Sequence, residues 1–318
     1  MKTALLLLAA LICQCAVAAD TYPARPVRVI VNFPPGAGVD IATRLVTTEL
    51  AKTLGQQFII DNRPGAAGNI GVELAAHAAP DGYTLLSATA ASAISQTIFS
   101  KISYDLNRDF APVAMIATSP FVLAVNPSQP VKTLQELISL AKSKPGQLTY
   151  ATPGTGSSPH LAFELFKMLA GVDILHVPYK GMVPAVTDTI GGNVSMTIGN
   201  TLTVMPNVRS GRLRGIAITT ATRSAVAPDL PTFAESGVAG FESGTWYGIM
   251  APANTPREIV IKLNAALLRA LQLPDVRAKL MAQGAEPLAT TPGQMRTYLR
   301  NEIAKWGKVA KASGAKFE

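Results

Sequence analysis

The sequence predicts an α/β fold with mainly parallel sheets flanked by helices, and two features of the chain indicate it. Short apolar runs alternate with segments of helical periodicity. Most of these runs are apolar throughout rather than alternating, which is typical of strands buried on both faces of a parallel sheet. Parallel strands need helical connections, and the alternation supplies them. A chain of 318 residues favours two sheets over a single large one.

The expected strands are short runs rich in Val, Ile and Leu. In open α/β sheets, ligands bind at the carboxyl ends of the strands, where this chain has its glycine-rich connections. In chain order the expected strands are Val27–Val31, Gln57–Asp61, Tyr83–Ser87, Phe121–Val125, Leu148–Ala151, Ile174–Pro178, Val194–Ile198, Leu213–Thr219 and Trp246–Met250.

The helix starts are marked by capping sequences. Thr133–Glu136 (TLQE) and Thr255–Glu258 (TPRE) match the capping box, in which two side chains satisfy free backbone amides at the start of a helix. Thr291–Gln294 (TPGQ) opens the last expected helix in the same way. Near the N-terminus, apolar residues at helical spacing from Ile41 to Leu54 predict a helix that ends at Gly55.

Residues 1–19 are expected to be a secretory signal peptide. They combine a basic start at Lys2, an apolar stretch from Ala4 to Ile12 and small residues from Ala16 to Ala19. The stretch is too short for a transmembrane helix. Both cysteines of the chain fall within it, so the mature protein would have neither a disulfide nor a cysteine metal site. The mature protein is expected to be exported.

The charge of the chain argues against nucleic acid as a partner. The formal net charge is +8, but Lys and Arg are scattered singly along the sequence. Aromatic residues make up only 6% and are not interleaved with basic ones, so no stacking platform is indicated. A basic surface does favour encounter with anionic small molecules.

Three glycine-rich loops share one position in the predicted fold, after a strand and before a helix. They are Pro34–Asp40, Asn62–Gly71 and Thr152–His160, the last with Ser158 as the expected N-cap and Pro159 as the first helical residue. The first turn of a helix has unpaired backbone amides, and glycine lets an anion approach them closely. Each loop alone is also compatible with an ordinary tight turn, but three of them together favour an anion site.

Nucleotide phosphates are the first alternative occupant of such loops. Neither GAGVDI nor GAAGNIG completes the dinucleotide pattern G-x-G-x-x-G, although Asp61 stands at the distance expected of a ribose-binding acid. No Gly-Lys-Ser/Thr follows any of these glycines, which excludes a P-loop.

Catalysis at these loops is the second alternative. His77, His160 and His176 lack metal-ligand spacing, and GTGSS is not the G-x-S-x-G elbow of hydrolases. We therefore expect no metal, no cofactor and no catalytic residue. A Ser157–His160 pair leaves an exported α/β enzyme open as an alternative function.

Several long stretches carry a resemblance to a known family. They are YPARPVRVIVNFPPGAGVD, DNRPGAAGNIGVELAAHAAPDGYTLL, GTGSSPHLAFELFK, HVPYKG and GRLRGIAITTATRSAVAPDLPTFAESG. In these motifs, and collinearly over nearly all of the mature sequence, the chain resembles the Bug (TctC-like) family. Its members are the periplasmic substrate-binding proteins of tripartite tricarboxylate transporters.

The resemblance implies a type II periplasmic binding protein, a two-lobed "Venus flytrap" that closes over a small carboxylate. Residues 20–124 and 241–318 would form the first lobe, and residues 125–240 the second. The strands that cross between the lobes would lie near Phe121–Asn126 and Phe241–Met250.

Members of the family grip a ligand carboxylate largely through backbone amides of loops from both lobes. Carried over to this chain, the gripping loops are Phe33–Asp40 and Thr155–His160, with weaker candidates around them. The expected ligand-binding residues are Phe33, Gly36, Ala37, Gly38, Asp40, Ala66, Ala67, Asn69, Thr89, Thr155, Gly156, Ser157, Ser158, His160, Tyr179 and Asn200.

Departures from the family pattern bear on the ligand. Val39 stands where the family often has threonine, so one hydroxyl is missing. Gly199 and Asn200 stand where the family tends to carry an Asp-Asn pair. The missing negative charge argues against recognition of an ammonium group. We therefore expect a mono- or dicarboxylate without an amine, aliphatic or aromatic.

The expected function is capture and delivery without catalysis, by a monomer. The membrane subunits of a tripartite tricarboxylate transporter are the candidate protein partner. A periplasmic sensor that binds a carboxylate without transport is a further alternative beside the exported enzyme.

Overall fold

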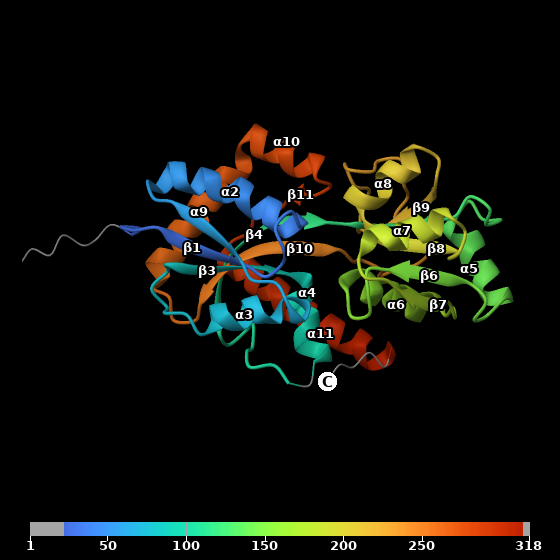
Figure 1. Ribbon diagram of the computed structural model, residues 1–318, viewed down its shortest axis with the longest axis horizontal. Coiled ribbons are helices and arrows are strands. Elements are labelled where there is room, and N and C mark those ends of the chain that lie inside the picture. Colours follow the sequence, from blue (N-terminus) through green and yellow to red (C-terminus); the bar gives the residue numbers. More distant parts are fainter. Residues whose placement is uncertain (1–21, 100, 314–318) are drawn as a thin grey trace, which may run out of the picture.

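The computed structural model describes residues 22–99 and 101–313, which form two lobes built on two sheets (Figure 1). The expected signal peptide lies outside the described residues. Within them, the sheet of lobe 1 has six strands in the order β11-β4-β10-β3-β1-β2, and the sheet of lobe 2 has five in the order β7-β6-β8-β5-β9.

Lobe 1 combines the N-terminal and C-terminal parts of the chain. Strand β1 runs parallel to β2 and β3, whereas β10 runs antiparallel to β3 and β4. Helices α2, α9 and α10 cover one face of the sheet, and α3, α4 and α11 cover the other. Its elements are β1 Val27–Val31, α2 Gly38–Leu54, β2 Phe58–Asn62, the 3-10 helix η1 Ala66–Gly68, α3 Asn69–Ala76, β3 Thr84–Thr89, α4 Ala90–Ile98, β4 Phe110–Ser119, β10 Thr245–Pro252, α9 Arg257–Gln272, α10 Pro274–Ala282, β11 Glu286–Pro287 and α11 Pro292–Ser313.

Lobe 2 is formed by the central part of the chain. Strand β6 runs parallel to β7 and β8, and β5 runs antiparallel to β8 and β9. Helices α5 and α6 pack on one face of the sheet, and α7 and α8 on the other. Its elements are β5 Phe121–Val125, α5 Leu134–Ser143, β6 Thr149–Thr152, α6 Ser158–Ala170, β7 Leu175–Pro178, α7 Met182–Ile190, β8 Met196–Asn200, α8 Thr201–Arg209 and β9 Arg214–Ile218.

The two crossings between the lobes are tied together by one buried threonine. The chain leaves lobe 1 at Pro120, between β4 and β5, and returns through Ser243 just before β10. The Thr219 hydroxyl accepts a hydrogen bond from the Phe121 amide at 2.8 Å and donates one to the Ser243 carbonyl at 2.7 Å. The first crossing precedes the expected boundary after residue 124, so that all of β5 lies in the sheet of lobe 2.

Helix α11 connects the lobes in a further way, by packing against both of them. Helix α11 packs along α4 and β4 of lobe 1. At its far end, Trp306, Val309 and Ala310 are buried in the apolar core of lobe 2, together with Phe166 and Phe241. The core of lobe 2 is therefore completed by residues from lobe 1.

All the expected strands are present, with bounds shifted by at most two residues. Strands β4 and β11 were not expected. β4 contains Pro112, and proline normally argues against a strand inside a sheet. The expectation of mainly parallel sheets is wrong, since both sheets are mixed. The strands that adjoin the crossings, β5 and β10, run antiparallel to their neighbours.

The capping boxes at Thr133 and Thr291 are confirmed: each hydroxyl accepts from the backbone amide three residues on. The one at Thr255 is wrong. Its hydroxyl donates to the Pro252 carbonyl at 2.8 Å, and helix α9 starts only at Arg257.

The expected N-cap of α6 was one residue too late. Ser157 is the N-cap, because its hydroxyl accepts from the His160 amide, and Ser158 is the first helical residue. Pro159 therefore takes the second helical position rather than the first.

Candidate functional site

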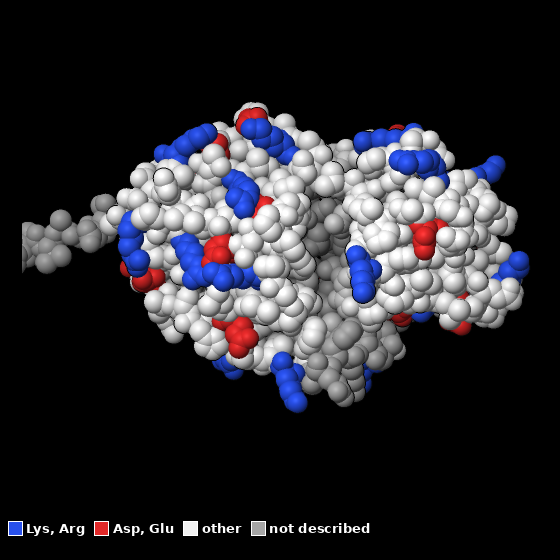
Figure 2. All heavy atoms as spheres, viewed as in Figure 1, with Lys and Arg blue, Asp and Glu red and all other residues white. Residues whose placement is uncertain are grey.

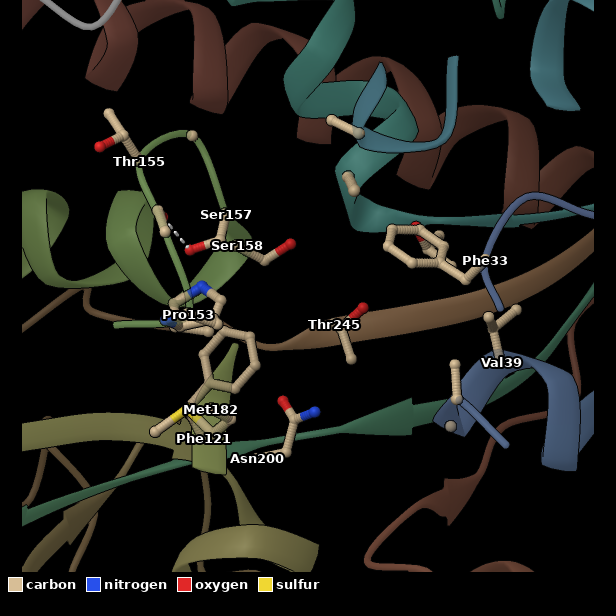
Figure 3. Close-up of a pocket in the computed structure, with 18 of the residues that line it drawn as sticks. Phe33, Val39, Phe121, Pro153, Thr155, Ser157, Ser158, Met182, Asn200 and Thr245 are labelled. Atoms are coloured by element: carbon tan, nitrogen blue, oxygen red, sulfur yellow. Dashed lines mark hydrogen bonds between the residues drawn. The ribbon is translucent and has the colours of Figure 1, made fainter. Parts of the chain in front are cut away.

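A cavity of about 420 Å³ lies between the lobes, and both contribute its walls. Figure 2 shows the hollow between the lobes, with Lys and Arg scattered over the surface rather than gathered at it. In Figure 3, Phe33 and Val39 face Pro153, Met182 and the turn before α6, with Thr245 between them. The described residues that line the cavity are Phe33, Ala37, Gly38, Val39, Ala67, Thr89, Ala91, Ile98, Phe99, Phe121, Pro153, Gly154, Thr155, Gly156, Ser157, Ser158, Pro159, Met182, Asn200, Thr245 and Tyr247.

Several helices begin at this cavity, and they come from both lobes. Helices α2 and α4 of lobe 1 start at Gly38 and just after Thr89, and α6 and α8 of lobe 2 start at Ser158 and just after Asn200. The amides of Gly38, Val39 and Ser158 have no hydrogen-bond partner within the described protein. Each helix start carries roughly half a positive elementary charge. The cavity therefore attracts anions although no described side chain that lines it is charged.

Uncharged polar groups complete the walls. Thr155, Ser158, Thr245 and Asn200 line the cavity, and their side chains are polar without fixed charge. The Thr89 hydroxyl is buried without a hydrogen-bond partner. An unpaired buried hydroxyl on a cavity wall is a group that a ligand or a water molecule can satisfy.

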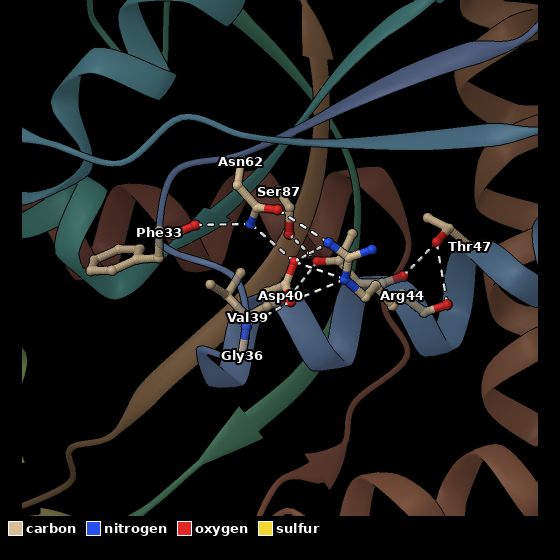
Figure 4. A network of polar contacts seen from close by, with 9 residues as sticks. Phe33, Gly36, Val39, Asp40, Arg44, Thr47, Asn62 and Ser87 are labelled. Atoms are coloured by element: carbon tan, nitrogen blue, oxygen red, sulfur yellow. Dashed lines mark hydrogen bonds and ion pairs between the residues drawn. The ribbon is translucent and has the colours of Figure 1, made fainter.

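The turn before α2 is held by a carboxylate network (Figure 4). Gly36 has a left-handed φ of 82°, and its amide donates to Asp40 Oδ2 at 2.9 Å. Asp40 also accepts hydrogen bonds from Arg44 Nε and Asn62 Nδ2, each at 3.0 Å. Asn62 Nδ2 in turn donates to the Phe33 carbonyl at 3.0 Å, which fixes the start of the loop. Burial alone would raise the pKa of Asp40, but Arg44, the Gly36 amide and Asn62 lower it below its ordinary value of 3.8.

The turn before α6 is held by a buried imidazole. Gly156 has a left-handed φ of 79°, and its amide donates to His160 Nδ1 at 3.1 Å. The His160 ring stacks on His176 with ring centroids 4.1 Å apart, and His176 stacks on Tyr150 at 4.9 Å. His176 Nε2 also bonds the Thr152 hydroxyl at 2.6 Å.

Burial lowers the pKa of both imidazoles. The pKa of His160 lies below its ordinary value of 6.5. Burial, and next the neighbouring His160, lower the pKa of His176 to about 4. Both rings are therefore neutral at neutral pH.

Most of the residues expected at the site line this cavity. Those that do are Phe33, Ala37, Gly38, Ala67, Thr89, Thr155, Gly156, Ser157, Ser158 and Asn200. Gly36, Asp40 and His160 lie behind the two turns and hold their shape. Ala66, Asn69 and Tyr179 are not on the cavity wall either. The Asn69 side chain accepts from the Tyr104 hydroxyl at 2.6 Å, and the Tyr179 hydroxyl donates to Asp188 at 2.7 Å.

The residues that sequence reasoning missed are mainly apolar. Phe121 and Tyr247 come from the strands that follow the two crossings, and Met182 from the start of α7. The others are Val39, Ala91, Ile98, Phe99, Pro153, Gly154, Pro159 and Thr245. Only Val39, Pro153, Gly154 and Pro159 could have been found from the glycine-rich loops, to which they belong.

The geometry does not form a catalytic serine–histidine pair. The Ser157 hydroxyl donates to the Gly154 carbonyl at 2.6 Å, and His160 Nδ1 is occupied by the Gly156 amide. Within residues 22–99 and 101–313, no group of three or more His, Cys, Asp or Glu side chains could hold a metal ion. No helix in these ranges is both long and apolar enough to cross a membrane.

Comparison with known proteins places the chain among binding proteins. Residues 42–315 match the model of the tripartite tricarboxylate transporter family receptor. The chain is 41% identical to protein BugT of Bordetella pertussis over 304 residues, which cover 95% of this chain and 93% of that protein.

Two solved structures of relatives contain organic acids. Rpa4515 of R. palustris, solved with adipate, is 39% identical with a TM-score of 0.80, covering 93% of this chain and 100% of that one. MatC of Rhodopseudomonas palustris, solved with bound malate, is 36% identical with a TM-score of 0.76. The match covers 91% of this chain and 99% of that one.

Proposed function

We propose that this chain, which belongs to the tripartite tricarboxylate transporter receptor family of periplasmic solute-binding proteins, captures a small organic carboxylate between its lobes. The captured ligand would be delivered to the membrane subunits of such a transporter. Capture and delivery need no chemical step, and the arrangement of Ser157 and His160 offers none.

The observation that carries the proposal is the meeting of helix starts on an uncharged cavity. Unpaired amides at Gly38, Val39 and Ser158 are donors that a carboxylate accepts from, and the helix dipoles add to the attraction. Charge-assisted hydrogen bonds of this kind contribute about 1.5–3 kcal/mol each. Because the donors come from both lobes, a carboxylate held by all of them would favour the closed arrangement.

The ligand we propose is a mono- or dicarboxylate without an amino group. Adipate and malate, found in two relatives, are both dicarboxylates without an amine. In this chain no described acidic side chain lines the cavity that could pair with an ammonium group. By the family resemblance, Gly199 and Asn200 stand where members tend to carry an Asp-Asn pair. The closing motion would turn about the two crossings, at Pro120 and Ser243.

The test is a thermal-shift screen of residues 20–318 against mono-, di- and tricarboxylates, aromatic acids and amino acids. The protein is unfolded and refolded first, so that no ligand is carried over from the cell. A ligand at a hundred times its dissociation constant adds about 2.7 kcal/mol of stability, which raises the melting temperature visibly. We expect a rise with one or more carboxylates and none with amino acids. No response to any carboxylate contradicts the proposal.

A pair of glycine variants ties the response to the cavity. Gly156→Val places a β-branched residue at a left-handed position of the cavity wall, so carboxylate binding should be lost in a folded protein. Gly171→Val is the matched control, because Gly171 has a φ of 62° and open space around it at the end of α6, away from the cavity. Equal affinity in both variants would show that the ligand binds elsewhere. Recovery of a chemically altered ligand would favour the exported enzyme instead.

A further inference from the structure

His160 lies one layer behind the cavity wall and faces the turn that forms it. Its Nδ1 accepts the Gly156 amide hydrogen, with 3.1 Å between the nitrogens. A ring nitrogen accepts a hydrogen bond only when it carries no proton. The geometry therefore requires a neutral imidazole with its proton on Nε2.

The surroundings of the ring keep it neutral. His160 is only 6% exposed, and its ring is stacked on His176. Glu164 on the same helix favours the charged form, but its carboxylate is engaged by Lys167 at 2.8 Å and by the Tyr150 hydroxyl at 2.6 Å. Lys167 and the positive start of α6 favour the neutral form. Burial is the largest influence, and it also disfavours charge.

We propose that neutral His160 is the positioning residue of the carboxylate site, and that protonation of its Nδ1 releases the Gly156 turn and weakens ligand capture. The added proton occupies the lone pair that the Gly156 amide uses, so two N–H groups would face each other. The turn then loses the bond that orients Thr155, Gly156 and Ser158 toward the cavity. The effect on affinity rests on the proposed carboxylate binding, whereas the hydrogen bond itself does not.

The hydrogen bond is tested in the free protein by NMR. The ¹⁵N shifts of the His160 ring should report the tautomer with the proton on Nε2. In a pH titration, the Gly156 amide resonance should follow the His160 imidazole, at pH values below the ordinary range of histidine. In His160→Asn the side-chain oxygen takes the place of Nδ1. The Gly156 amide should therefore stay hydrogen-bonded, and its resonance should no longer change with pH. A proton on Nδ1 overturns the inference, whichever acid binds. So does a Gly156 amide resonance that does not change as the His160 imidazole titrates.

The effect on capture is tested by calorimetric titration with adipate and with malate as the pH is lowered. Loss of one neutral hydrogen bond predicts about a two- to tenfold lower affinity once His160 is protonated. His160→Phe, which has no acceptor, should show the loss at every pH. His160→Asn should keep the affinity and show only the pH dependence that protonation of the acid itself causes.

Two further histidines serve as controls. His77→Asn changes an exposed histidine that is not on the cavity wall, so its binding profile should match the unaltered protein. His176→Gln removes the other buried imidazole. Its carboxylate affinity should still fall at low pH, because the hydrogen bond from the Gly156 amide to His160 remains. The proposal is contradicted if the loss of carboxylate affinity at low pH persists in His160→Asn beyond what protonation of the acid causes. It is also contradicted if that loss disappears in His176→Gln. If neither acid binds the unaltered protein while the NMR result holds, the proposed ligand class fails and the role of His160 in the turn stands.

Discussion

The turn before α2 and the turn before α6 have nearly the same backbone. Gly36 and Gly156 have φ of 82° and 79°, and the N-caps Ala37 and Ser157 have φ and ψ of −66° and 153° against −67° and 155°. In each turn the side chain at the third helical position reaches back to the glycine amide. That position is Asp40 in lobe 1 and His160 in lobe 2.

The two turns differ in the group that accepts the hydrogen bond from the glycine amide. Asp40 is a charged acceptor that needs Arg44 and Asn62 to be stable when buried. His160 is a neutral acceptor that needs only an apolar, stacked environment. One backbone shape can therefore be held in two electrostatic ways. The lobe 1 turn should be insensitive to pH near neutrality, and the lobe 2 turn sensitive as the pH falls.

The largest effect should come from placing the same residue at both positions. Asparagine offers one oxygen acceptor, so it replaces His160 well but Asp40 badly, since a second donor would then face Arg44 or Asn62. Asp40→Asn should lower the free energy of unfolding by about 2–4 kcal/mol. His160→Asn should lower it by about 1 kcal/mol or less. Urea denaturation at neutral pH measures both, and equal losses would mean that charge is not what distinguishes the turns.

Acid should act on the two turns in different pH ranges. A histidine whose folded pKa is depressed stabilises the fold above its unfolded pKa, and that stability is lost as pH falls. For His176 the loss runs from 6.5 down to about 4, and the lowered pKa of His160 adds to it in the same direction. Asp40 also has a lowered pKa, so its contribution is lost only below 3.8.

Denaturant unfolding at a series of pH values measures this separation. His176→Gln should flatten the decline between pH 6.5 and about 4, and Asp40→Asn should leave that decline in place. A decline in the upper range that is unchanged in His176→Gln would contradict the assignment.

The smallest effect should come from exchanging the N-caps. Ser157 caps α6 through its hydroxyl, whereas Ala37 leaves α2 without a side-chain cap. Ser157→Ala should lower the free energy of unfolding by about 1 kcal/mol, and Ala37→Ser should raise it by about 0.5–1 kcal/mol. By analogy with Ser157, the new hydroxyl would accept from the Asp40 amide, so the Gly38 and Val39 amides stay free and carboxylate affinity should change little. No gain in the free energy of unfolding in Ala37→Ser would contradict the assignment of this position as the N-cap of α2.

Local patterns in the sequence were enough to place the two turns. A strand, a glycine at a tight position and a helix start follow one another within about ten residues, and such order needs no long-range information. The same logic would have shown that Asp40 and His160 point backward, because the capping box already places a reaching side chain at the third helical position. The familiar pattern has Glu or Gln at that position, whereas the family resemblance implies ligand contacts for Asp40 and His160 as members of the two gripping loops.

The floor of the cavity could not be predicted from local patterns. Phe121 and Tyr247 are far apart in sequence, and both line the cavity because the two crossings are held together at Thr219. Met182 reaches the cavity because Gly199, on the neighbouring strand, has no side chain to exclude it. Which apolar residues line the cavity depends on how the lobes meet, and hydrophobic periodicity does not encode that.

The far end of α11 links the apolar cores of the two lobes. Trp306 and Val309 cover apolar residues of lobe 2 that include Phe166 and Phe241. A separated central lobe would expose that apolar surface to water. A chain that ended before Trp306 would lose part of the core of lobe 2, although the missing residues belong to a helix of lobe 1. We therefore expect both sheets to unfold together, although the segment between Pro120 and Ser243 is a continuous insertion between two strands of lobe 1.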